Sequence, residues 1–202
     1  MTTVGVTGGI GSGKSAFVAR LGAHEGTRVV LADALAKQLM AEDEAVRQRL
    51  VERFGPETFD AEGALNRAGL GARVFADADE LAALNGIVHP AVRQALTEAV
   101  EQARADGVRV LVYEAALLVE TGGESVVDLV VVVDAPVEVR VARAAARDGV
   151  SEAAILARVR HQADPAVARA RADRVVDNTG DLAALHAEAD ALARDLGLPP
   201  IG

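Results

Sequence analysis

Short, continuous runs of apolar residues recur along the chain, separated by segments in which apolar residues have helical spacing. Continuous runs are typical of strands that are covered on both faces of a sheet. Strands that alternate with helices predict an α/β fold, here a doubly wound five-stranded parallel sheet with right-handed crossovers. The predicted strands cover residues 4–7, 28–31, 108–113, 129–133 and 174–177.

Helical spacing fills the segments between these strands. A first helix is expected from about residue 13, and further helices within 34–54 are ended by Gly55 and Pro56. The segment 57–107 has no strand pattern, so it predicts a helical insertion in which a helix begins after Pro90. The remaining predicted helices cover 137–148, then 151–162 with Ser151 as the cap, and 182–196.

Composition excludes several classes of function. The chain has 202 residues, half of them hydrophobic, which suits one domain with a sizeable core. A net charge of −9 argues against a broad surface for nucleic acid or anionic membrane. With four Phe, one Tyr and no Trp, the chain also lacks side chains on which bases of single strands stack.

The absence of cysteine excludes disulfides, thiolate metal sites and cysteine catalysis. No apolar stretch is long enough to cross a bilayer, and no secretory signal is recognised. We therefore expect cytoplasmic residence, small-molecule ligands, and a monomer or weak homo-oligomer.

The segment Thr7-Gly8-Gly9-Ile10-Gly11-Ser12-Gly13-Lys14-Ser15 contains a complete phosphate-binding loop, or P-loop. Its glycines let backbone N–H groups point at phosphate oxygens, Lys14 reaches the β- and γ-phosphates, and the Ser15 hydroxyl coordinates Mg²⁺. A strand before the loop and a helix after it make the motif specific, and they argue against a glycine-rich turn that binds nothing. The expected ATP-binding residues are Gly9, Gly11, Ser12, Gly13, Lys14, Ser15 and Ala16.

Carboxylates follow three of the predicted strands. Asp33 comes after the second, where it can accept or orient the proton of an attacking hydroxyl; capping of the next helix is the alternative. The P-loop favours the catalytic role. Glu114 and Asp134 end the third and fourth strands, and either can hold Mg²⁺ beside Ser15. For Asp134 we favour a helix cap, and Glu114 stays open.

Arginines at residues 140, 143 and 147 share one face of a predicted helix. Arginines stabilise the charge that spreads over phosphate oxygens during phosphoryl transfer. A solvated face that pairs with carboxylates such as Asp148 is the alternative. Because the helix follows a strand that ends near the phosphate site, Arg143 and Arg147 are favoured as phosphate-binding residues.

The histidines have no metal-ligand spacing. His24, His161 and His186 are interpreted as surface residues, whereas His89 before Pro90 is placed at a helix start, where it lines an acceptor pocket or caps the helix. Residues 60–63 match the DxxG motif of GTPases, but no NKxD motif accompanies it, so this segment is interpreted as a turn.

The P-loop together with three later segments resembles the dephospho-coenzyme A kinase family. The segments are Leu84-Asn85-Gly86-Ile87-Val88-His89-Pro90, Leu117-Leu118-Val119-Glu120 and Ala172-Asp173-Arg174-Val175-Val176-Asp177-Asn178. They occur in matching order from about residue 3 to 180, and the combination is more specific than the P-loop alone.

The resemblance implies ATP-dependent phosphorylation of the 3′-hydroxyl of dephospho-coenzyme A, the last step to coenzyme A. Asp33 then resembles the proposed base, Arg143 the lid arginine that meets ATP phosphates, and Asn178 the residue near the adenine. Acceptor binding is implied for Asp33, His89, Leu117 and Glu120. The implied organisation is one domain over 1–202, with a core of 1–56, 108–136 and 173–200, an acceptor-binding insertion over 57–107 and a lid over 137–172.

Three positions depart from the family pattern. The family's Asp-x-Asp after the second strand is Leu31-Ala32-Asp33 here, which weakens any role that needs both carboxylates. Ala116 stands where the family has proline, and Ala16 replaces a common threonine after the loop serine.

Two other functions compete with this one. A nucleoside-monophosphate or shikimate-type kinase would share the P-loop and the lid arginines. An NTP-dependent switch or assembly protein would hydrolyse slowly and bind a protein partner, but it should carry a base-reading motif, and the chain has none.

Overall fold

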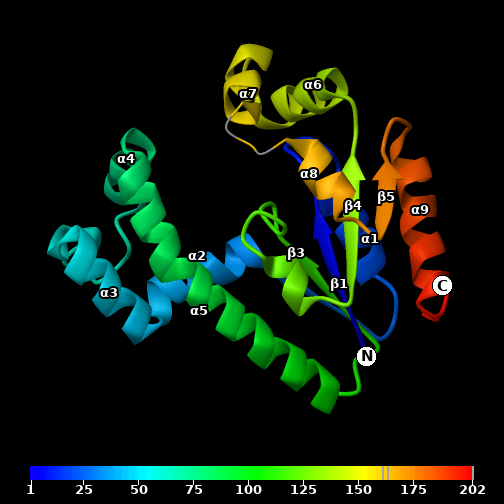
Figure 1. Cartoon of the computed structure of the whole chain (residues 1–202), viewed down its shortest axis with the longest axis horizontal. Helices are drawn as coiled ribbons and strands as arrows, with labels where there is room; N and C mark the ends of the chain where they lie inside the picture. Colours follow the sequence, from blue (N-terminus) through cyan, green and yellow to red (C-terminus); the bar gives the residue numbers. More distant parts are fainter. Residues whose placement is uncertain (161, 163, 202) are drawn as a thin grey trace. The chain divides into compact units, whose positions relative to one another are not determined.

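The computed structural model describes residues 1–160, 162 and 164–201, and for Phe75 the backbone alone. Among these residues five strands form one parallel sheet in the order β2-β3-β1-β4-β5 (Figure 1). The predicted α/β class and doubly wound parallel sheet are confirmed. The strands are β1 (Thr2–Thr7), β2 (Thr27–Leu31), β3 (Val110–Glu114), β4 (Leu129–Asp134) and β5 (Arg174–Asp177).

The strand order places β1 in the middle of the sheet, between β3 and β4. Glu114 pairs in register with Val6 on one side and with Leu31 on the other, while Thr7 pairs with Val132. The connection after β1 leads toward β2 and the one after β4 leads to β5, so the direction of winding changes between β1 and β4. Ligands of doubly wound sheets bind at such a point, beyond the carboxyl ends of the strands.

The structure divides into two compact units, the first made of Met1–Leu31 and Ala99–Gly202 and the second of Ala32–Glu98. The first unit contains the sheet. Figure 1 shows α6 and α7 beyond the carboxyl end of β4. The helices of this unit are α1 (Lys14–Gly22), the 3₁₀ turn η2 (Gly123–Val126), α6 (Val137–Asp148), α7 (Glu152–Val159), α8 (Pro165–Ala170) and α9 (Leu182–Asp195).

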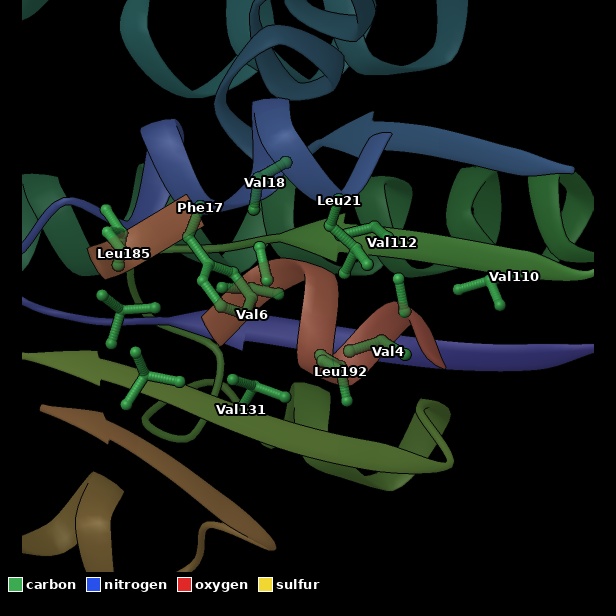
Figure 2. Close-up of a cluster of buried hydrophobic side chains, with 14 of the residues drawn as sticks. Val4, Val6, Phe17, Val18, Leu21, Val110, Val112, Val131, Leu185 and Leu192 are labelled. Atoms are coloured by element: carbon green, nitrogen blue, oxygen red, sulfur yellow. The ribbon is translucent and has the colours of Figure 1, made fainter. Parts of the chain in front are cut away.

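The core of the first unit lies between the sheet and the helices α1 and α9. In Figure 2, Phe17 and Leu21 of α1 and Leu192 of α9 point toward strand residues such as Val4 and Val112. Phe17, Leu21, Val4 and Val112 are all fully buried. The helix that follows the P-loop is therefore anchored on the sheet by large apolar side chains, which holds the start of the helix in place.

The second unit is helical and has its own apolar core. Leu50 and Phe54 pack there with Val74 and Ile87, and all four are buried. The segment 60–63 forms a turn, as predicted, in which the Gly63 amide donates to the Asp60 carbonyl. The elements are α2 (Ala32–Glu42), α3 (Glu44–Phe54), the 3₁₀ turn η1 (Pro56–Thr58), α4 (Arg67–Ala76) and α5 (Ala78–Ala105), whose last turns belong to the first unit.

The second unit differs in extent from the insertion expected over 57–107. It starts at Ala32, because α2 and α3 pack their apolar residues against α4 and α5, with Leu39 and Val46 in the same cluster as Leu70. It ends at Glu98, within α5.

The prediction that a helix begins after Pro90 was wrong. His89 and Pro90 lie inside α5, which runs without interruption from Ala78 to Ala105. Proline is normally excluded from helix interiors because its ring crowds the carbonyl four residues earlier. That residue is Gly86, and α5 nevertheless continues through Pro90.

Two further helix predictions need correction. The helix capped by Ser151 ends at Val159, shorter than the range to 162, and the short helix α8 was not predicted. Pro165 occupies the first turn of α8 and Asp164 accepts from the Ala166 amide, which are the signals that mark its start. In the part of the chain that the structure describes, no helix is long and apolar enough to cross a membrane.

His24 was expected on the surface, and this expectation was wrong. The residue is 4% exposed, and its ring nitrogens lie 2.8 Å from the Pro199 carbonyl and 3.0 Å from Asp190 Oδ1. Arg20 of α1 donates to both oxygens of Asp190, at 2.7 and 2.8 Å. This cluster joins α1, α9 and the C-terminal segment. His186 is half-buried, and His161 lies outside the described residues.

Asp190 should make the stability of the protein depend on pH in the acid range. The hydrogen bonds from Arg20, and secondarily those from His24, lower the pKa of Asp190 to about 2. A depressed carboxyl pKa contributes stability above the unfolded-state value of about 4, and this contribution is lost as the pH falls toward 2. We expect Asp190→Asn to destabilise the protein more at pH 5 than at pH 2.5, by about 1 kcal/mol in urea unfolding.

Asp195→Asn is the matched control, because it removes a 2.8 Å ion pair with Arg174 whose carboxylate is 68% exposed. Its effect should be nearly the same at both pH values. An Asp190→Asn effect that is equally independent of pH would contradict the interpretation.

Candidate active site

The P-loop connects β1 to α1 and has the backbone that phosphate binding requires. Gly11 and Gly13 have φ values of 76° and 96°, in the left-handed region that side-chain-bearing residues avoid. Gly13 is the N-cap of α1, so the N-terminal end of this helix, with its free N–H groups, faces the loop. Free amides at a helix start form an anion site. The hydroxyl of Ser12 is buried and has no hydrogen-bond partner among the described residues, so it is available to a ligand.

Three segments from later in the chain pack directly against the glycines of the loop. A Cβ on Gly8 would lie 2.2 Å from the carbonyl oxygen of Val133, at the end of β4. A Cβ on Gly11 would lie 2.0 Å from the carbonyl oxygen of Arg140, in α6. Backbone atoms cannot move aside as a flexible side chain can, so only glycine fits at these two positions.

Asn178, which follows β5, supports the loop from a third direction. Its Nδ2 donates to the Ser12 carbonyl at 2.8 Å and would lie 2.3 Å from a Cβ on Gly13. The residue is 7% exposed, and its backbone amide donates to the carbonyl of Asp134. Asn178 therefore holds the P-loop against the end of β5.

Glu114, at the end of β3, is the carboxylate beside the P-loop. The Ser15 hydroxyl donates to Glu114 Oε1 at 2.9 Å, and Lys14 Nζ lies 3.9 Å from the same oxygen. Of the two carboxylates considered for Mg²⁺, Glu114 contacts the P-loop serine, and its role toward the metal stays a prediction.

Asp134 has other partners, and the helix cap expected for it was wrong. Its Oδ1 accepts from the Ala135 amide, which precedes α6, and Oδ2 accepts from Arg169 at 3.0 Å. The N-cap of α6 is Pro136, without a side-chain cap.

A cavity of about 210 Å³ adjoins the P-loop within the first unit. Leu117 and Glu120 line it together with Gly8 and Gly9, as does Asp134. The Thr7 hydroxyl donates to the Ala116 carbonyl at 3.3 Å, which ties the turn that carries Leu117 to the start of the P-loop. The structure thus brings Leu117 and Glu120 to the phosphate loop, at the point where the winding of the sheet changes direction.

The three arginines of α6 have different surroundings. Arg143 donates to the carbonyls of Asn178 and Gly180, at 2.9 and 2.8 Å, and so fixes the loop after β5. Arg147 is exposed and pairs with Asp148, which Arg158 also contacts, as the solvated-face alternative predicted. Their hydrogen bonds and charges, above all those of Arg147, lower the pKa of Asp148. Arg140 was not among the arginines favoured for phosphate binding, yet it is the buried one of the three, with 5% of its surface exposed.

Comparison with known proteins gives a consistent result. Residues 2–184 match the family model for dephospho-CoA kinase. A dephospho-CoA kinase of Salinibacter ruber is 47% identical over 182 residues, which cover 90% of this chain and 91% of that protein.

The chain belongs to the dephospho-CoA kinase family.

Solved structures share the fold of this chain. A crystal structure of a Thermus thermophilus protein is 37% identical and superposes with a TM-score of 0.79, over 96% of this chain and 97% of that one. A dephospho-CoA kinase from Campylobacter jejuni, at 23% identity, has a TM-score of 0.64 over 96% and 97% of the two chains, which supports the fold.

Two residues that the family resemblance assigns to catalysis and acceptor binding belong to the second unit. Asp33 lies in the first turn of α2, two residues after the end of β2, and is exposed. His89 is half-buried in α5, where burial and then the charge of Arg93 lower its pKa. Their roles toward the P-loop stay predictions.

Gln162 is a site residue that the sequence analysis missed. Its Oε1 accepts from the Ile10 amide of the P-loop at 3.0 Å, across 152 residues of sequence, and the residue lines the same cavity. A glutamine between two helices has no recognisable pattern, so only the folded chain reveals this contact. Gln162 thus connects the segment between α7 and α8 to the P-loop.

Asn178→Asp should weaken nucleotide binding in this member of the family. The substitution replaces the Nδ2 donor with a carboxylate oxygen facing the Ser12 carbonyl, which disturbs the P-loop and adds negative charge near the phosphates. We expect the Kd of a non-hydrolysable ATP analogue to rise about tenfold in calorimetry.

Asn66→Asp is the control, because aspartate keeps the oxygen that caps α4 by accepting from the Gly69 amide. It should leave the affinity unchanged. Equal affinities for both variants would contradict a supporting role of Asn178.

Proposed function

We propose that this protein transfers the γ-phosphate of ATP to the 3′-hydroxyl of the dephospho-CoA ribose, giving CoA and ADP. The observation that carries the proposal is the junction of two features in one cavity. The P-loop lines it with Gly8 and Gly9, and the Leu117–Glu120 turn, which the family resemblance assigns to the acceptor, lines it too. A donor and an acceptor can therefore meet there.

The donor end of the site follows from the P-loop. The amides at the start of α1, from Gly13 to Ala16, would surround the inner phosphates, and the Lys14 ammonium would neutralise charge on the outer ones. In the structure Lys14 Nζ is 3.9 Å from Glu114, a separation that leaves the ammonium free to contact a phosphate as well. These positive groups stabilise the negative charge that develops on the β-phosphate as the bond to the γ-phosphate breaks.

The residues near Ser15 fit a magnesium ion. The Ser15 hydroxyl and the Glu114 carboxylate lie 2.9 Å apart, and they supply the oxygen ligands that Mg²⁺ prefers. Among the described residues no group of three or more His, Cys, Asp or Glu side chains forms a cage, and Mg²⁺ in kinases takes its other ligands from phosphates and water. An ion held there would neutralise negative charge on the phosphate oxygens.

The acceptor end needs a group that takes the proton of the attacking hydroxyl. Asp33 is our candidate, because it follows β2, whose last residue pairs in register with Glu114 at the P-loop. The bond from the 3′-oxygen to phosphorus forms, the bond from phosphorus to the bridging oxygen breaks, and the carboxylate accepts the proton. His89 would contribute to acceptor binding in the same unit as Asp33.

The competing functions share the donor chemistry and differ in the acceptor. A nucleoside-monophosphate or shikimate-type kinase would use the same P-loop, and a switch protein would need no acceptor. Membership of the dephospho-CoA kinase family supports the proposed acceptor over these alternatives.

An acceptor panel tests the proposed function. We expect rapid formation of ADP in a coupled assay only when dephospho-CoA is present, and not with AMP or shikimate. Equal turnover without an acceptor would support a switch protein, and turnover with another acceptor would support a different kinase.

Asp33→Asn should lower kcat about 100-fold or more, while the Kd of ATP changes little, because the amide cannot accept the proton. Asp43→Asn is the control, since Asp43 caps α3 in the same unit through the Val46 amide and asparagine caps equally well. Unchanged turnover of Asp33→Asn would return this residue to a structural role at the start of α2.

A further inference from the structure

Arg140 is a buried arginine beside the P-loop that the proposed chemistry does not yet use. It lies in α6 and is 5% exposed. Its Nε donates to the Ala135 carbonyl at 3.0 Å, which fixes the direction of the side chain. Among the described carboxylates, Asp134 lies within ion-pair distance, with Arg140 Nε 3.9 Å from Oδ1. That carboxylate also accepts from Arg169 at 3.0 Å, so two arginines share it.

The outer part of the guanidinium lies directly against the P-loop. A Cβ on Gly9 would be 2.0 Å from Arg140 Nη1, so the side chain occupies the space that glycine leaves free. Arg140 lines the cavity that also contains Gly8 and Gly9. Its Nε is held by the Ala135 carbonyl, and its positive charge lies at the wall of the cavity beside the P-loop. A guanidinium is a strong, charge-assisted donor to phosphate oxygens, so its position beside the loop fits a phosphate group.

Charged groups of both signs line this cavity. Arg160 is a second cation, whereas Glu120, Asp134 and Asp164 supply carboxylates, and Asp164 accepts from the Ala166 amide at the start of α8. Asp134 is already engaged by Arg169, which also contacts Asp177 at 3.0 Å. The guanidinium of Arg140 is thus the cation in closest contact with the backbone of the P-loop on the cavity side.

We propose that Arg140 binds the outermost phosphate of the nucleotide, the group that is transferred. This inference rests on the proposed function. P-loop amides near the helix start enclose the inner phosphates, so a group beside Gly9 faces outward from them. The same cavity contains Leu117 and Glu120, on the side from which the acceptor arrives. Arg140 therefore lies between the donor site and the acceptor site.

The two Nη groups can donate to the equatorial oxygens of the phosphoryl group. During transfer the bond to the bridging oxygen breaks, the bond from the acceptor oxygen forms, and negative charge spreads over these oxygens. A fixed guanidinium stabilises that charge without rearrangement, because its Nε is already held by the Ala135 carbonyl. Arg140 differs in this respect from Arg143, whose Nη1 and Nη2 donate to backbone carbonyls of the loop after β5.

The test compares two nucleotides that differ in the outermost phosphate. Calorimetry with Mg²⁺ measures the Kd of ADP and of a non-hydrolysable ATP analogue for the full chain. For Arg140→Gln we expect the Kd of the ATP analogue to rise about tenfold and that of ADP by less than about twofold. Arg140→Lys keeps the charge but loses the planar arrangement of donors. It should raise the Kd of the ATP analogue about threefold, again with little effect on the Kd of ADP.

Arg194→Gln is the matched control, because it removes the same charge from an exposed position on α9 in the same unit. It should change neither affinity. If Arg140→Gln fails to fold, as judged by its melting curve, the lysine variant carries the comparison.

If Arg140→Gln raised the Kd of ADP and of the ATP analogue by the same factor, the proposal would be overturned, because Arg140 would then only shape the P-loop. Unchanged affinities with a raised KM for dephospho-CoA would overturn it in favour of acceptor binding. If the unaltered protein binds neither nucleotide, the proposed function itself fails, and the role of Arg140 with it.

Discussion

The site depends on one steric constraint, the close packing of later segments against the backbone of the P-loop. The carbonyl of Val133 lies behind Gly8, the carbonyl of Arg140 beside Gly11 and the amide of Asn178 beside Gly13, each too close to allow a Cβ. The loop must hold its amides toward a ligand, and within it the Ser12 amide donates to the Gly9 carbonyl at 3.1 Å. Packing from three directions holds it in that conformation before any ligand binds, which removes part of the cost of ordering.

The topology of the sheet explains why these three segments meet at the loop. Parallel strands in the order β2-β3-β1-β4-β5 place the ends of β3, β4 and β5 on the same edge as the end of β1. Glu114, Val133 and Asn178 therefore reach the P-loop from separate strands, although more than 90 residues of sequence separate each of them from it. Buried side chains of α1 and α9, such as Phe17 and Leu185, pack against the sheet and hold these two helices in place. The helical second unit has an apolar core of its own, so α2 to α5 can fold around Leu50 and Phe54 without contributing to the sheet.

Much of this arrangement can be predicted from the sequence, because it is recorded in local patterns. Apolar runs identify all five strands, and the P-loop motif identifies the donor site with Lys14 and Ser15. The errors arise where a distant contact overrides a local signal. Pro90 marks a helix start by propensity, yet it lies within α5, which runs from Ala78 to Ala105. His24 has a polar side chain in a polar segment, yet Asp190 and the Pro199 carbonyl bury it. The roles of Gln162 and Arg140 depend on tertiary contacts with the P-loop, which no spacing in the sequence records.

The most direct test of this account is a crystal structure of the protein with Mg²⁺, a non-hydrolysable ATP analogue and dephospho-CoA. The account predicts the triphosphate inside the loop from Gly8 to Ser15, the metal on the Ser15 hydroxyl, and the 3′-hydroxyl of the acceptor in line with the outermost phosphate. A triphosphate bound elsewhere, with the P-loop amides facing solvent or protein atoms, would contradict it.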